Sequence, residues 1–77
     1  MDNGIYSTSD LWLAAYLRTT GMRIIRIEGG VRKAVFIFAD TGNREELIKD
    51  FYNDAQVGIT AIKNAMADLK SAIFNMA

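Results

Sequence analysis

The chain has 77 residues with no cysteine and no histidine, and nine basic residues balance nine acidic ones. These absences exclude disulfides, thiolate chemistry and the commonest metal ligand. Hydrophobic residues make up 51% of the chain, and a domain this small without a covalent or metal staple often gains stability by associating with another chain. We therefore expect one domain over residues 1–77, flexible over residues 1–5, that forms a homo-oligomer, with a dimer favoured.

The sequence contains no apolar run near the length of a membrane span. The first ten residues, MDNGIYSTSD, carry neither a basic segment nor an apolar segment of the kind found in signal peptides. We accordingly predict a cytoplasmic protein that has no membrane partner.

A first helix is predicted over residues 7–20. Ser7 is expected to cap it, and Asp10 stands three residues on, where a carboxylate suits the positive end of the helix dipole. The segment LWLAAYLRTT is apolar on nearly every side, with Trp12 and Tyr16 sharing one face. Such a helix is buried on more than one side.

Two β-rich runs, RIIRI and AVFIFA, flank Gly29 and Gly30, and this pattern predicts an antiparallel hairpin. The apolar residues do not alternate with polar ones, so both faces of the ribbon are apolar. A two-stranded ribbon of this kind must be covered by other elements or by another chain.

The register of the hairpin has two interpretations. A two-residue loop would place Arg26 opposite Lys33, with like charges facing each other. A three-residue loop over residues 29–31 would place Glu28 opposite Arg32. We expect the second, because opposite charges favour a register and like charges disfavour it.

Two further helices are predicted after the hairpin. The first covers about residues 43–53 and is expected to be capped by Thr41 or Asn43. The second covers about residues 58–76 and has the clearest amphipathic pattern in the chain. Phe74 lies off its apolar stripe and is therefore a candidate contact outside the core of the monomer.

These elements predict an α+β fold of order α-β-β-α-α, in which a two-stranded antiparallel hairpin packs on helices and is extended or covered in an oligomer. Excess apolar faces on both the first helix and the hairpin point to a subunit interface. The candidate interface residues are Trp12, Tyr16, Ile25, Val35, Phe38 and Phe74.

The order of motifs STSDLWLAAYL, VFIFAD, FYN and LKSAIF resembles a domain-of-unknown-function family, family number 5659, over Tyr6 to Phe74. The resemblance implies a compact α/β domain of the short proteins encoded by microbes and their viruses, and it implies no activity. The chain departs from the family pattern at Gly42, where proline is frequent, and at Gly58, where a polar helix-starting residue is more usual.

No enzyme site can be assembled from the residues present, because a serine nucleophile would need a lysine base, and Lys70 and Ser71 diverge on their helix. The acidic residues between 40 and 54 match no cation-binding loop, and we interpret them as a solvated face. The Gly29–Gly30 pair joins two strands instead of preceding a helix, so we interpret it as a turn and not as a phosphate cradle. We expect no catalytic residue, no metal and no cofactor.

A basic cluster is the one remaining functional signal. Five basic residues and one acid between positions 18 and 33 give a local charge of 5 − 1 = +4. The cluster makes nucleic-acid binding the alternative function, although the pI of about 6.1 disfavours it. The favoured function is a non-enzymatic interaction module that self-associates in a microbial or viral system, with a separate protein partner also open. The candidate nucleic-acid contacts are Arg18, Arg23, Arg26, Arg32 and Lys33.

Overall fold

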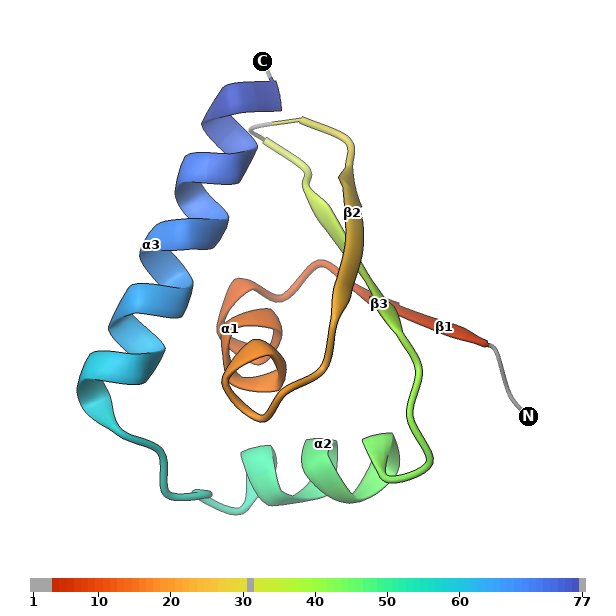
Figure 1. Ribbon diagram of the computed structural model, residues 1–77, viewed down its shortest axis with the longest axis vertical. Coiled ribbons are helices and arrows are strands. Elements are labelled where there is room, and N and C mark those ends of the chain that lie inside the picture. The colour runs from red at the N-terminus through yellow and green to blue at the C-terminus, as the bar shows by residue number, and fades with distance from the viewer. Residues whose placement is uncertain (1–3, 31, 77) are drawn as a thin grey trace.

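The structure, a computed structural model, describes residues 4–30 and 32–76, and these residues form three helices and three strands (Figure 1). In chain order the elements are β1 (Ile5–Thr8), α1 (Leu11–Thr19), β2 (Ile24–Glu28), β3 (Val35–Ala39), α2 (Arg44–Tyr52) and α3 (Ile59–Met76). The strands form one antiparallel sheet with the order β1-β3-β2. The α+β class is confirmed, but the sheet has a third strand that the hairpin prediction did not include.

The third strand is β1, whose last two residues, Ser7 and Thr8, were predicted to begin the first helix. Ser7 lies opposite Ile37 in the β1–β3 ladder, so its prediction as a helix cap was wrong. The cap is Asp10, whose carboxylate accepts hydrogen bonds from the backbone N–H of Trp12 at 3.0 Å and of Leu13 at 3.2 Å. The short segment IYST is a strand because it forms backbone hydrogen bonds with β3. The helix does not need Ser7, because aspartate is as good a helix cap as serine.

The start of β1 is tied to the end of β3. The backbone N–H of Asp40 donates to the carbonyl of Gly4 at 3.1 Å, and Ile5 lies opposite Ala39. Residues 4 and 5 are thus paired with the sheet, while residues 1–3 lie outside the described part of the chain.

The β2–β3 hairpin has a longer connection than either predicted loop. Glu28 lies opposite Val35, so neither expected pair, Glu28 with Arg32 or Arg26 with Lys33, forms. Both predicted registers were wrong, and the end of the predicted three-residue loop lies outside the described residues.

A β-bulge in β2 explains why the apolar residues do not alternate. Ile24 lies opposite Phe38 and Ile27 lies opposite Phe36, so Ile25 is one residue more than the ladder needs. Phe36 and Phe38 point to the same face because they are two residues apart. The extra residue lets Ile24 and Ile27, three residues apart, reach that same face, which we call the inner face of the sheet.

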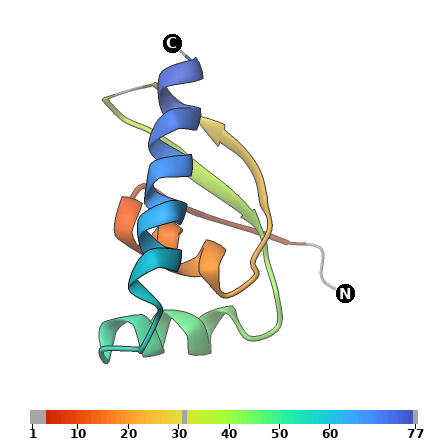
Figure 2. The same ribbon diagram turned by 60° about the vertical axis from the view of Figure 1, so that its left-hand side comes forward.

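The core lies between the inner face and the helices, with α1 at its centre (Figures 1 and 2). Five consecutive residues of α1, from Leu13 to Leu17, are buried, and α1 contacts α2, α3 and β1. The most deeply buried large side chains are Phe36, Phe38, Leu17 and Leu69. Burial of α1 on several sides is thus confirmed, and one copy of the chain supplies most of that burial by itself.

The two later helices lie close to their predicted positions. Asn43 holds the N-cap position of α2, but its side chain makes no capping hydrogen bond. It accepts a hydrogen bond from the hydroxyl of Thr41 at 2.8 Å instead. The helix α3 runs alongside α1 and its residues Ala65 and Leu69 join the core.

Candidate interaction surfaces

A groove between α1 and α3 is one candidate interaction surface. It has a volume of about 520 Å³ and is lined by Trp12 of α1 and by Ile59, Ile62, Lys63, Met66, Ala67 and Lys70 of α3. The side chains of Trp12 and Ile59 are 59% and 81% exposed. Five of the seven lining residues are apolar, so this groove, which we call the α1–α3 groove, exposes apolar surface that the monomer leaves uncovered.

The α1–α3 groove carries positive charge. Lys63 and Lys70 both line it, are exposed and stand seven residues apart on α3. Within the described part of the chain, neither lysine has a carboxylate at ion-pair distance. The acidic residue on this part of α3, Asp68, pairs instead with Arg18, at 3.8 Å. The lining residues thus contribute two positive charges and no negative one.

The second candidate surface is the outer face of the sheet, opposite to the core. Val35, Ile37 and Ala39 lie on this face because they alternate along β3 with Phe36 and Phe38 of the inner face. Ile5 lies on it because it is opposite Ala39. Ile37 is buried but is not part of the core cluster. Ile5 is 56% exposed, and in Figures 1 and 2 the helices gather on the other side of the sheet.

Two of the three charges on the outer face of the sheet neutralise each other. Arg26 and Glu28 stand two residues apart on β2, and the Arg26 Nε donates to the Glu28 carboxylate at 2.6 Å. Ile25, the bulge residue, is exposed beside them. Arg23 lies beside Ala39, whose N–H donates to the Arg23 carbonyl at 2.9 Å, and it adds one exposed positive charge at the end of this otherwise apolar face.

The six predicted interface residues lie in four different places. Tyr16 and Phe38 are buried in the core, so a partner could not reach either side chain in this structure, and we withdraw them as interface candidates. Ile25 and Val35 lie on the outer side of the sheet. Trp12 lines the α1–α3 groove, and Phe74, which is 68% exposed, stands farther along α3.

The five predicted nucleic-acid contacts are all exposed, but the structure does not leave all of their charges available. Arg18 faces Asp68 and Arg26 is bound to Glu28. Arg23 precedes β2, whereas Arg32 and Lys33 lie in the connection between β2 and β3. The basic cluster is thus divided between α1 and the hairpin, and two of its five charges face an acid.

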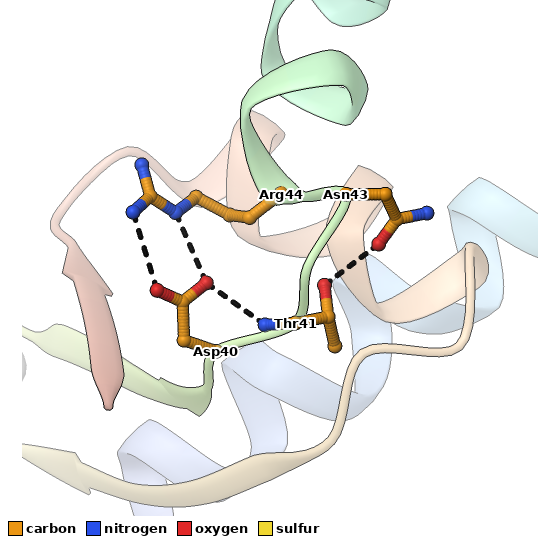
Figure 3. A network of polar contacts seen from close by, with 4 residues as sticks. All are labelled: Asp40, Thr41, Asn43 and Arg44. Carbon is orange, nitrogen blue, oxygen red and sulfur yellow. Dashed lines mark hydrogen bonds and ion pairs between the residues drawn. The ribbon is translucent and has the colours of Figure 1, made fainter. Parts of the chain in front are cut away.

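A polar network joins the end of β3 to the start of α2 (Figure 3). The Arg44 guanidinium donates to both carboxylate oxygens of Asp40, at 3.1 and 3.2 Å, and lies 4.7 Å from the centre of the Tyr6 ring. The backbone N–H of Thr41 also donates to Asp40, at 2.8 Å. The hydrogen bonds from Arg44 hold the pKa of Asp40 below its ordinary value, and the carboxylate raises the pKa of Arg44. The network therefore holds the start of α2 against the end of β3, and we interpret its role as structural.

Sequence reasoning did not identify four residues of these surfaces. Ile59 belongs to the apolar stripe of α3 and was assigned to the core, while Ile5 was assigned to a loose end. Lys63 was interpreted only as a polar residue outside the stripe, and Lys70 was considered only as a possible base for Ser71. Their spacing of seven, which returns to the same side of a helix, is the signal that could have found them.

No group of three or more acidic side chains gathers to hold a metal ion within the residues that the structure describes. In residues 4–30 and 32–76, no helix is long and apolar enough to cross a membrane.

A family model described as a domain of unknown function, DUF5659, matches residues 3–75. The chain belongs to this family. The match confirms the family that the sequence motifs predicted and covers nearly the whole of the chain. No curated protein and no solved structure matches it. The DUF5659 description carries no activity, so any function must be argued from the surfaces described above.

Proposed function

We propose that this protein is a non-enzymatic interaction module of a microbial or viral system, and that it self-associates through the outer face of its sheet. The observation that carries the proposal is the apolar row on this face, to which each of the three strands contributes. Ile5 and Ile25 are 56% and 45% exposed, and the described helices pack on the opposite face. Covering such a face with a second copy removes apolar surface from water, which favours association.

The charges on this face favour contact with an identical surface. In a dimer with two-fold symmetry each patch meets its own copy, so a patch of one sign would face the same sign. Arg26 and Glu28 cancel within each copy, which removes most of that repulsion and leaves a single charge, Arg23, at the end of the face. The zero net charge of the chain also allows copies to approach.

The edges of the sheet are less suited to association than its outer face. A bare strand edge can pair with another chain, but bulges, charges and short strands discourage this. The edge strand β2 has a bulge at Ile25 and carries Arg26 and Glu28, while the other edge, β1, has four residues. Face-to-face contact therefore explains the exposed isoleucines better than edge-to-edge pairing.

Light scattering over a concentration series tests the proposal. The unaltered protein is expected to change from monomer to dimer within the micromolar to millimolar range that suits a small interface. The Ile25→Glu variant should stay monomeric, because two carboxylates would then face each other in an apolar contact. The matched control is Ile59→Glu, which changes an exposed isoleucine on α3, and it should associate like the unaltered protein.

Two results would refute self-association through the sheet. One is an unaltered protein that is monomeric throughout the series. The other is a dimer that Ile59→Glu disrupts and Ile25→Glu does not. Circular dichroism of each variant verifies that it is folded before its mass is interpreted.

Nucleic-acid binding through the hairpin is the second candidate function. Its supporting observation is that Arg32 and Lys33 are adjacent and exposed in the connection between β2 and β3. If it is correct, the unaltered protein binds a duplex or single-stranded probe at about 50 mM salt, and the affinity falls steeply by about 200 mM. The double variant Arg32→Glu/Lys33→Glu should then lose binding, whereas no binding at low salt ends the idea.

A further inference from the structure

The α1–α3 groove lies apart from the outer face of the sheet and has a different chemistry. On α3, Lys63, Lys70 and Phe74 fall on one side of the helix, since seven and four residues correspond to about two turns and one turn. Met66 and Ile59 border that side and line the groove with Trp12. The groove is therefore an apolar strip with two positive charges, which are separated by about 10 Å along the helix axis.

A second copy of the same helix fits this strip poorly. If two α3 helices packed antiparallel about their middle, Lys63 of one copy would lie near Lys70 of the other. If they packed parallel, each lysine would lie near its own copy. Either arrangement opposes like charges, which disfavours the contact.

The acidic helix of the chain does not fit the strip either. The acidic side chains of α2 are exposed, but its apolar residues Leu47, Ile48 and Phe51 already pack against the core of their own copy. Its free side therefore lacks an apolar stripe. A complementary occupant needs both an apolar stripe and acidic residues beside it.

We propose that the α1–α3 groove binds an amphipathic helix of another protein, one that carries an apolar stripe flanked by acidic residues. The apolar side chains of this helix would cover Trp12, Ile59 and Met66, as in other helix-in-groove complexes. Two acidic residues about seven positions apart would face Lys63 and Lys70. The proposal is independent of self-association, because the two surfaces share no residue.

A titration with synthetic helices tests the proposal directly. One probe is a peptide of about 18 residues with leucines at helical spacing and glutamates on both sides of the leucine stripe. The matched probe has lysine at each glutamate position. Trp12 is the single tryptophan of the chain and is 59% exposed, so its fluorescence reports occupancy of the groove.

The expected result is a saturable shift of Trp12 emission to shorter wavelength with the glutamate peptide and a much weaker response to the lysine peptide. The double variant Lys63→Glu/Lys70→Glu should bind the glutamate peptide roughly tenfold more weakly and should prefer the lysine peptide. The double variant Arg32→Glu/Lys33→Glu reverses two charges on the hairpin instead and should bind like the unaltered protein.

Several outcomes would overturn the proposal. Equal binding of both peptides would show that apolar contact alone governs the groove, and no response up to about 1 mM peptide would show that the groove takes no such helix. An emission shift produced by raising the protein concentration alone would show that a second copy covers Trp12. Light scattering of Ile25→Glu separates this last outcome from association through the sheet.

Discussion

Deletion of Ile25 tests the arrangement of the sheet more directly than any substitution. In the ladder, Ile24 faces Phe38 and Ile27 faces Phe36, and Ile25 is the extra residue between them. A chain without Ile25 can keep both of these pairs and leave each side chain on its present face. A deletion in the middle of a strand usually moves all following side chains to the opposite face, so tolerance here would be unusual.

The expected cost of this deletion is small. Ile25 is 45% exposed, so its removal forfeits about half of the 1.5–3 kcal/mol that full burial contributes, or about 1 kcal/mol. Loss of the bulge makes the ladder regular, which offsets part of this cost. A domain of 77 residues has a free energy of unfolding of about 4–12 kcal/mol, so the variant should remain folded.

Deletion of Ile27 is the matched control. It would move Glu28 into the position opposite Phe36, on the face that meets the core. The cost includes the lost packing of Ile27, about 1–2 kcal/mol because this side chain is partly buried, and the burial of a carboxylate with no partner. This variant should be barely folded or unfolded.

Urea unfolding followed by circular dichroism measures both variants. Low micromolar protein is used, so that any association through the sheet contributes little, and an unchanged slope against urea verifies that the folded states are comparable. If deletion of Ile25 costs as much as deletion of Ile27, Ile25 is not an extra residue and the assigned register is wrong.

Two further predictions concern the connections that follow β2 and β3. The backbone of Gly29 has a φ of +88°, and a Cβ there would overlap the Lys33 carbonyl oxygen. Gly29→Ala should therefore cost more than the 1–2 kcal/mol of a left-handed residue, whereas Gly30→Ala, which meets open space, should be nearly neutral in urea unfolding; similar losses from both would contradict this. Because Arg44 lowers the pKa of Asp40, the stabilisation from that pair is complete above about pH 4 and is lost as the pH falls through the lowered pKa. Asp40→Asn should thus lower stability at pH 7 and differ less from the unaltered protein at about pH 2, and a difference that does not shrink would refute this role.

The sequence by itself determined the elements whose pattern is local. The periodicity of α3, the turn glycines of the hairpin and the nearly all-round apolar surface of α1 each depend on neighbours within a few turns or on a single strand. These predictions agree with the structure because side-chain periodicity and backbone freedom act over short distances.

Only the tertiary structure decided the features that depend on distant segments. The segment Ile5–Thr8 is a strand because β3 pairs with it, and its serine and threonine residues resemble a helix cap equally well. The register depends on the bulge at Ile25, which lets β2 place apolar residues opposite both Phe36 and Phe38. Pairing between nearby charges could not indicate this bulge.

For the candidate interaction residues, likewise, the sequence indicated which are apolar, and the tertiary structure decided which are exposed. Composition correctly indicated apolar surface beyond the needs of one core, with Trp12 and Ile25 among the exposed residues. Tyr16 and Phe38 were assigned to an interface because their helix and strand appeared to have too many apolar faces. The core of a single copy covers both residues, because Tyr16 packs against Phe51 of α2 and Phe38 lies beside Tyr6 of β1. Which apolar side chains stay exposed is decided by such long-range contacts, and a local pattern does not contain them.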